Sequence, residues 1–286
     1  MTLLVCVDET STTPRVLRHA VAFAKASGLG LHVIRVLDPR IDLVQGKNDS
    51  DQVIADVAAA LKDEVSKQLE EAGGSGQVSI PVLEAKDSVA ATIIRTAEST
   101  NAKAIAMGSH GAGLFRRTVL GSVAMGVVAG ARVPALVVGP QAPEAPATDT
   151  DYTLLIADDG SQASRACIDA LQPLLRNGRL RLVLMHLYEP RLGDEGEEQE
   201  LRAALEGLET ERDALPNPEL ATCLVRTLPD FERVDAAILR VAEELGVQAV
   251  AMATRGYSAR QHILAGSVAV GVLKHAKTPV MLVRRP

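Results

Sequence analysis

The 286-residue chain contains few aromatic residues and few cysteines. It has no Trp, three Phe and three Tyr, so its cores must be aliphatic, and stacking on several exposed nucleic-acid bases is not expected. The three cysteines Cys6, Cys167 and Cys223 show no C-x-x-C spacing, which indicates free thiols in a reducing compartment. The sequence also has no H-E-x-x-H motif and no Cys/His cluster, so it offers no support for a structural zinc site or a metallohydrolase.

Long apolar runs and excess positive charge are also missing. The most apolar stretch, 123–139, is interrupted by Arg132 and Pro134, and it is too short to span a bilayer. The N-terminal residues lack a basic region and soon reach Asp8, which favours a strand over a signal peptide. A net charge of −6 argues against a general nucleic-acid binder. We therefore expect a cytoplasmic protein with no membrane or nucleic-acid partner.

The sequence repeats itself. Residues 107–138 and 252–283 align without a gap at a constant offset, so that Pro134 matches Pro279 (279 − 134 = 145). The beginnings of the two halves also match, which places Asp8 opposite Asp159. Between the halves lies a segment with three prolines and no large apolar residue, which is typical of a linker. We predict a first domain at 1–140, a linker at 141–150 and a second domain at 151–286.

Apolar strand patterns alternate with amphipathic helix patterns in each half. In the first half, strands are expected at 3–7, 31–37, 78–83, 104–107 and 135–138. Helices are expected from a cap at 11–14 to residue 27 and at 51–72, 88–101 and 122–131. Pro81 indicates that the third strand lies toward a sheet edge. This alternation predicts two doubly wound α/β domains, each with a five-stranded parallel sheet and right-handed crossovers.

A glycine loop follows the fourth predicted strand of the first half. It reads Gly108-Ser-His-Gly111, then nine residues, then Gly121-Ser122 at the start of a helix. Glycines permit positive φ and let backbone N–H groups approach a phosphate, and the helix N-terminus offers unpaired N–H groups and a positive dipole end. Ser122 is either a hydroxyl donor to phosphate or an N-cap, and His110 either contacts phosphate or faces solvent. The loop is neither a Walker A motif nor a G-x-G-x-x-G fingerprint.

The position of this loop fits a ligand site. Ligands of open α/β sheets bind outside the carboxyl ends of the strands, where the strand order reverses. Asp8 ends the first predicted strand, and the glycine loop leaves the fourth. If these two strands are neighbours, Asp8 and the loop face one crevice.

The G-x2-G-x9-G-S pattern, the aspartate after the first strand and the closing Pro-Ala-Leu-Val-Val strand resemble the universal stress protein family, twice over essentially the whole chain. The resemblance implies an adenine-nucleotide α-hydrolase-like fold whose domains pair through their last strands, here as an intramolecular pseudo-dimer, with a homodimer also open. It also implies that ATP, AMP or ADP binds, with Mg²⁺ bridging the phosphates. The implied contacts of the first half are Asp8, Val36, Met107, Gly108, Gly111, Gly121, Ser122 and Val123.

The second half departs from this pattern at one position. Ala253 replaces the first glycine, so a Cβ stands where the backbone should be bare, and a close approach or positive φ would be penalised there. The corresponding contacts of the second half are Asp159, Leu187, Gly256, Gly266, Ser267 and Val268. Arg255 either reaches a phosphate or is simply exposed.

Three functions follow as hypotheses. The first is an adenine-nucleotide-binding stress regulator, and the second is a non-enzymatic interaction module whose pocket is degenerate or binds another small molecule. The third is an enzyme, either a slow ATPase or an adenylyl-transfer relative of the same fold superfamily. No G-x-S-x-G, S-G-G-x-D-S or H-x-G-H motif and no general base is evident, so any hydrolysis is expected to be slow. No catalytic residue or protein metal ligand is assigned. Asp158 is interpreted as a local variant outside the site, and the acidic run 194–200 as the start of a solvated helix.

Overall fold

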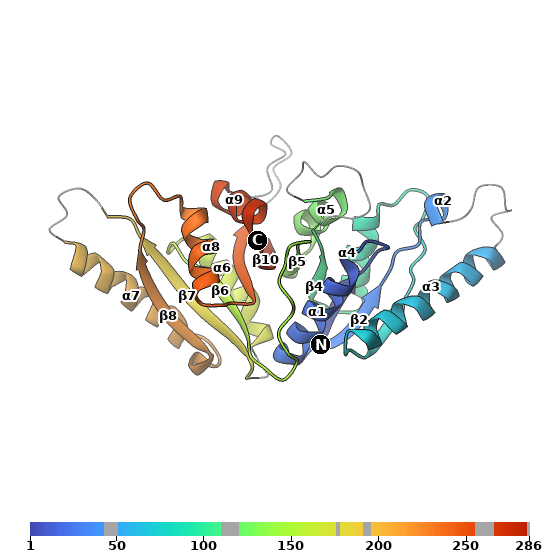
Figure 1. Ribbon diagram of the computed structural model, residues 1–286, viewed down its shortest axis with the longest axis horizontal. Coiled ribbons are helices and arrows are strands. Elements are labelled where there is room, and N and C mark those ends of the chain that lie inside the picture. The colour runs from blue at the N-terminus through green and yellow to red at the C-terminus, as the bar shows by residue number, and fades with distance from the viewer. Residues whose placement is uncertain (43–50, 110–119, 176–177, 191–195, 255–265, 285–286) are drawn as a thin grey trace.

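A single ten-stranded sheet with helices on both faces forms the protein (Figure 1). The structure is a computed structural model of residues 1–286, and it describes residues 1–42, 51–109, 120–175, 178–190, 196–254 and 266–284. None of the helices within these ranges has the length and apolar content needed to cross a membrane.

The two halves contain the same order of strands. Those of the first half are β1 Thr2–Cys6, β2 Gly30–Ile34, β3 Gly76–Ser79, β4 Ala102–Gly108 and β5 Ala135–Val138. Those of the second half are β6 Tyr152–Ala157, β7 Leu180–Tyr188, β8 Ala221–Thr227, β9 Ala249–Thr254 and β10 Val280–Arg284.

Helices connect these strands. The first half has α1 Thr13–Ser27, α2 Pro39–Asp42, α3 Asp51–Glu71, α4 Val89–Ser99 and α5 Ser122–Gly130. The second half has α6 Gln162–Leu171, α7 Glu197–Asp213, α8 Val234–Glu244 and α9 Ser267–His275, with short 3₁₀ turns at Gln172–Leu174 and Pro218–Leu220. Helix α7 begins in the acidic run, as predicted.

The strands follow the order β3-β2-β1-β4-β5-β10-β9-β6-β7-β8. Pairing within each half is parallel, and the halves meet where β5 and β10 pair antiparallel, with Val280 opposite Val137 and Leu282 opposite Ala135. The predicted α/β class with two five-stranded parallel units is therefore confirmed. Strand β3 lies at a sheet edge, as Pro81 indicated.

Local differences from the predicted elements have physical reasons. The second and third strands end early, at Ile34 and Ser79, because Pro81 has no N–H for a ladder; its carbonyl instead accepts the Leu37 N–H at 2.9 Å. Helix α2 was not predicted, since four residues carry no periodicity. At the start of α1 the side chain of Thr12 makes no capping hydrogen bond. Ser88 caps α4 as predicted, by accepting the Ala91 N–H at 3.2 Å.

Alternating side chains of the strands belong to two separate cores, one on each face of the sheet. Leu3 and Val5 of β1 belong to the core under α1, α3, α6 and α7, whereas Leu4 belongs to the core under α4, α5, α8 and α9. Both cores run through the two halves without a break. Cys6, Cys167 and Cys223 are free thiols, in agreement with the sequence.

Residues 139–151 form neither helix nor strand and lie along α1. His19 donates its Nε2 hydrogen to the Pro143 carbonyl at 2.9 Å, and Arg18 pairs with Glu144 at 3.2 Å. Arg15 donates to the Pro140 carbonyl. Burial in this contact lowers the pKa of His19, so its ring is neutral near pH 7. The connection is therefore fixed to the first half by side chains of one helix.

One aromatic contact joins the halves within the core. Phe23 of α1 packs edge-to-face on Tyr152 of β6, with ring centroids 5.3 Å apart, and both side chains are fully buried. The Tyr152 hydroxyl is buried without a hydrogen-bond partner among the described residues. A buried hydroxyl without a hydrogen-bond partner destabilises the folded state, whereas burial of the ring stabilises it.

We expect Tyr152→Phe to raise the free energy of unfolding by about 1 kcal/mol, because it removes the unpaired hydroxyl and keeps the ring. Phe23→Ala should lower it by about 3–5 kcal/mol, because it opens a cavity in the core. Urea denaturation followed by circular dichroism measures both. A clear loss of stability in Tyr152→Phe would mean that the hydroxyl is bonded after all.

Candidate functional site

A pocket opens where the strand order reverses between β1 and β4. Strands β1 and β4 are neighbours, with Cys6 opposite Met107, so Asp8 lies just beyond the same sheet end as Gly108. A cavity of about 220 Å³ lies there, and five predicted residues line it: Asp8, Val36, Met107, Gly108 and Val123. The structure thus brings these five together, while Gly111 and His110 lie outside the described residues.

Asp8 is held in place by the start of α1. Its Oδ1 accepts hydrogen bonds from the Thr10 N–H at 3.0 Å and the Thr10 hydroxyl at 2.5 Å, and the Thr13 hydroxyl donates to the Asp8 carbonyl at 2.7 Å. No hydrogen bond to Oδ2 occurs among the described residues. The carboxylate is therefore oriented through one oxygen, and the other oxygen keeps its lone pairs for a ligand.

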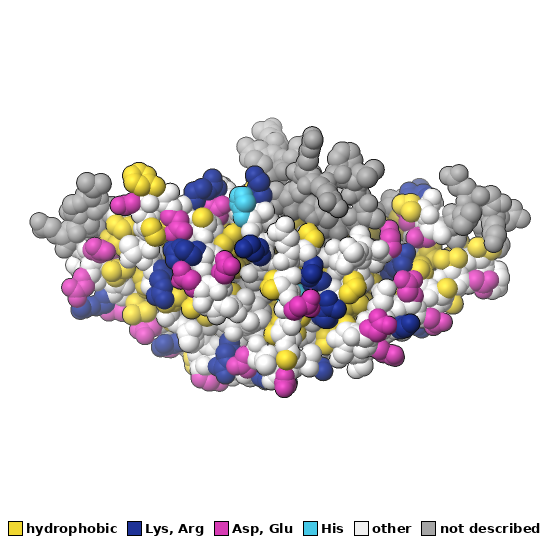
Figure 2. Space-filling view, in the orientation of Figure 1, with side chains coloured by type: hydrophobic (Ala, Val, Ile, Leu, Met, Phe, Trp, Pro, Cys, Tyr) yellow, Lys and Arg dark blue, Asp and Glu magenta, His cyan; other side chains and the backbone are white. Residues whose placement is uncertain are grey.

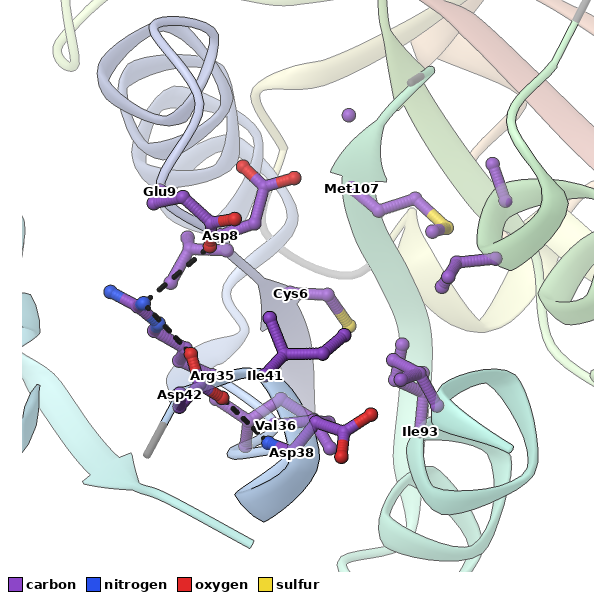
Figure 3. Close-up of a pocket in the computed structure, with 16 residues that line it drawn as sticks. Cys6, Asp8, Glu9, Arg35, Val36, Asp38, Ile41, Asp42, Ile93 and Met107 are labelled. Atoms are coloured by element: carbon purple, nitrogen blue, oxygen red, sulfur yellow. Dashed lines mark hydrogen bonds and ion pairs between the residues drawn. The ribbon is translucent and has the colours of Figure 1, made fainter. Parts of the chain in front are cut away.

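The walls of the pocket are largely apolar. Cys6, Ile34, Ile93 and Met107 surround it, and Figure 3 shows the sulfur-bearing side chains of Cys6 and Met107 on its inner side. Burial raises the pKa of the Cys6 thiol, so it stays protonated and acts as a wall rather than a nucleophile. Such a slot suits a flat apolar ring with a polar group at the Asp8 end.

The mouth of the pocket carries an excess of acid that the sequence did not reveal. Arg35, only 12% exposed at its side chain, lies 3.5 Å from Glu9 and 3.6 Å from Asp42 (Figure 3). Asp38 also lines the pocket; a bidentate hydrogen bond from Arg40 lowers the pKa of Asp38. A repeat in the sequence could have identified Asp38, because its Asp-Pro-Arg segment recurs in the second half as Glu-Pro-Arg at 189–191.

The helix that follows the glycine loop begins without a side-chain cap. Gly121 is the N-cap of α5, and its N–H donates to the Ser109 carbonyl at 2.8 Å. Ser122 is the first helical residue, so its interpretation as an N-cap is wrong. Because the N-cap Gly121 has no side chain to cap α5, the part of the chain that the structure describes leaves the N–H groups of its first turn to an anion.

The two described glycines of this loop, Gly108 and Gly121, do not have positive φ. Gly121 has φ −65° and ψ 161°, a conformation open to other residues, and Gly108 is not among the positive-φ glycines. The expectation that positive φ requires glycine here is therefore wrong for these two positions. Ala253, which replaces Gly108 in the second half, consequently carries no backbone strain, and only its Cβ occupies extra space.

The second half has a corresponding pocket of about 480 Å³. Its lining includes five predicted residues, Asp159, Leu187, Gly266, Ser267 and Val268, whereas Gly256 and Arg255 lie outside the described residues.

Asp159 matches Asp8 in its surroundings. Burial acts to raise its pKa, but hydrogen bonds from Ser161 and Ser164 outweigh burial and lower it, so the carboxylate is ionised near pH 7. Helix α9 again starts from a glycine N-cap, Gly266, without a side-chain cap. The two halves therefore repeat the carboxylate and the uncapped helix.

Asp158 was interpreted as a local variant outside the site, but it is buried, lines the Asp159 pocket as well, and belongs to a second polar cluster. With Arg165, His186 and Glu211 it lines a cavity of about 560 Å³ between α6 and α7. Burial, and then the charge of Asp158, raise the pKa of Glu211 to about 7, although Arg165 bonds Glu211 at 3.2 Å. The first half has Val7 in place of Asp158, and sequence alone could not pair residues 158 and 211.

Comparisons with known proteins agree across the whole chain. The model of the universal stress protein family matches residues 1–139 and again residues 152–284. A universal stress protein of Mycolicibacterium smegmatis is 32% identical over 208 residues, which cover 70% of this chain and 67% of that relative.

Solved structures agree in fold. The crystal structure of a universal stress protein from Archaeoglobus fulgidus DSM 4304 has a TM-score of 0.66 at 22% identity and covers 100% of this chain and 98% of its own. A functionally unknown protein from Pseudomonas aeruginosa PAO1 has a TM-score of 0.61 at 18% identity, with 99% and 92% covered.

The carboxyl pair Asp158–Glu211 predicts a pH dependence of stability. The folded state holds the Glu211 proton more tightly than the unfolded chain, so the stabilisation is complete below the ordinary pKa near 4.5 and is lost as pH rises through about 7. We expect Glu211→Gln, whose amide imitates the protonated acid, to remove about 1–3 kcal/mol of this pH dependence. The free energy of unfolding of Glu211→Gln should equal that of the parent at pH 5 and exceed it at pH 8.

Urea melts at several pH values measure this effect. The matched control is Glu209→Gln on the same helix, where Glu209 pairs only at the surface with Arg212. Equal pH profiles for the parent and Glu211→Gln would contradict the prediction.

Proposed function

The chain belongs to the universal stress protein family and carries two copies of its domain in tandem, and from this premise we propose that it is a regulatory protein that binds an adenine nucleotide. One observation carries the proposal. An oriented carboxylate with a free oxygen, Asp8, lies at one end of an apolar slot that is also bordered by the uncapped start of α5.

The apolar slot suits the base and ribose. Its volume of about 220 Å³ is below the range of about 300–1,000 Å³ typical for whole ligands, so the slot holds the base and ribose and leaves the phosphates outside it. The ribose hydroxyls donate to the free oxygen of Asp8, a charge-assisted hydrogen bond. The apolar side chains of Val36 and Met107 contact the base.

The phosphates bind at the start of α5. The first-turn N–H groups and the dipole of α5 favour an anion there, and glycine at 121 leaves room for it. Arg35 is the single basic residue among the described residues lining the pocket, and carboxylates surround it.

The site fits a bound Mg²⁺, which needs only one or two protein carboxylates beside phosphate oxygens and water. The pocket mouth, with Glu9, Asp38 and Asp42, offers such carboxylates. The ion supplies positive charge that an acidic pocket mouth otherwise lacks.

The acidic residues at the pocket mouth also favour the alternative, an interaction module that binds a ligand with less negative charge. Glu9, Asp38 and Asp42 would repel a triphosphate in the absence of a divalent cation. Under the leading proposal, binding of ATP depends strongly on Mg²⁺; under the alternative, adenosine or another uncharged ligand binds as well as ATP.

Regulation follows from linkage. A ligand that binds the folded chain stabilises it by an amount that grows with ligand concentration, so ATP level changes the population of the folded, paired state. The two halves, joined by β5 and β10, form the regulated unit, with a homodimer as a further level of assembly.

We expect Gly121→Val to weaken ATP binding to the first half by at least tenfold. Its φ and ψ suit a β-branched residue, so the fold is retained while the side chain covers the first-turn N–H groups of α5. Isothermal titration with ATP and Mg²⁺ measures the effect. Gly207→Ala, on α7 where an added Cβ meets nothing within 4 Å, is the matched control. Null heats from the unaltered chain would refute the nucleotide proposal.

A further inference from the structure

A fully exposed aromatic residue, Phe231, lies in a turn whose two ends border the second pocket. The turn between β8 and α8 runs from Leu228 to Val234, and both of these residues line the cavity of about 480 Å³ that contains Asp159. Phe231, in the middle of this turn, is 105% exposed. Full exposure of a Phe side chain is unfavourable in water, and this chain has only three.

The backbone at Phe231 is also strained. The Glu232 N–H donates to the Pro229 carbonyl at 3.0 Å and closes a turn in which Phe231 is the third residue, with φ 63°. Positive φ at this position favours Gly or Asn, and it costs free energy for a bulky residue. Among the described non-glycine residues, only Asn101 shares a positive φ.

The fold does not require this strain. The first half has the same turn, closed by the Asp87 N–H and the Glu84 carbonyl at 3.0 Å. The residue equivalent to Phe231 is Lys86, and it does not have positive φ. The strained, exposed aromatic ring is therefore particular to the second half.

The turn is held firmly at its far end. Arg240 of α8 donates to Glu232 through Nε at 3.1 Å and Nη2 at 2.9 Å, as Arg95 pairs with Asp87 at 2.5 Å in the first half. Since Glu232 is fixed, the neighbouring ring is presented from an ordered backbone. Presenting a side chain in this way lowers the entropy cost of using it to bind.

We propose that Phe231 is a ligand-binding residue of the second half, and that its ring stacks on the flat aromatic base of the ligand in the Asp159 pocket. This inference rests on the proposed nucleotide function. Three observations favour a ligand over other occupants: Phe231 lies in the turn between two residues that line the cavity, that cavity is more than twice the volume of the first, and its lining includes the apolar side chains of Leu187 and Met252. Stacking between such walls is a recognition mode that every purine can use.

The test uses the full chain with the first site weakened by Gly121→Val. In this background ATP binds the second pocket, and Phe231→Ala weakens it about 5- to 150-fold, the range expected for loss of one base–aromatic stack. Phe231→Tyr, which keeps the ring, retains the parent affinity. Inorganic tripolyphosphate, which has no base, binds equally with and without Phe231→Ala. Lys86→Ala, at the equivalent position of the first half, changes neither the affinity for ATP nor the affinity for tripolyphosphate.

A second measurement examines the free protein. Phe231→Gly melts at a higher temperature than the parent without ligand, because glycine relieves the strain at φ 63°. A lower melting temperature would show that the ring packs on its own chain, which overturns the proposal.

Four binding results would overturn it. ATP binding by the unaltered chain that disappears entirely in Gly121→Val would leave the proposed function in place but remove the ligand from the second pocket. An unchanged affinity in Phe231→Ala would exclude stacking, and a shift from dimer to monomer in sedimentation with unchanged affinity would assign the ring to a second copy. Absence of ATP binding in the unaltered chain would remove the proposed function as well.

Discussion

The antiparallel pairing of β5 with β10 is the constraint on which the rest of the molecule depends. Each half has its own parallel sheet, whose last strand would otherwise be an open edge of unpaired N–H and C=O groups. Joining these edges makes one sheet and two continuous cores. The neighbouring last strands of the two halves run in opposite directions, so the equivalent helices of the halves cover the same face of the sheet. Both pockets lie on that face, one between strand ends and the helices α4 and α5, the other between strand ends and α8 and α9. Figure 1 shows α5 and α9 on either side of this junction.

Within that frame the two pockets have diverged. Both retain a strand-end carboxylate and a helix that starts at an uncapped glycine. In the first, α2 places the exposed Ile41 on a small cavity. In the second, the cavity is larger, and the turn between two of its lining residues, Leu228 and Val234, contains the strained Phe231. The face of the molecule drawn in Figure 2 shows both signs of charge interspersed.

Much of the fold could be predicted from sequence because the repeat and the strand–helix alternation are strong local signals. The alternation of strands and helices, the edge position of β3 and the cap Ser88 follow from such signals, whereas the neighbouring positions of β1 and β4 were only a condition of the prediction. The pocket residues Asp8, Val36, Met107, Gly108 and Val123 could be grouped because the repeat and the family resemblance placed the first four near strand ends and Val123 at the start of the helix after the glycine loop. What could not be predicted depends on contacts distant in sequence: the Asp158–Glu211 pair joins a strand end to a helix 53 residues later (211 − 158), and helix α2 is too short to show a period. The φ of Gly121 also could not be predicted. A glycine in a sequence can serve either a close approach of the backbone to a ligand or a positive φ, and the sequence does not distinguish these two reasons.

The firm attachment of the connecting segment to α1 has an evolutionary consequence. His19 and Arg18 hold it along one helix, and the two halves of the chain pair with each other through β5 and β10. In a symmetric pair of identical one-domain subunits, every substitution appears twice and alters both pockets together. Covalent union ends that coupling. Natural selection can then keep one pocket unchanged as a reference while the other acquires a new preference, and a single gene product can respond to two different ligands at a fixed ratio of one to one.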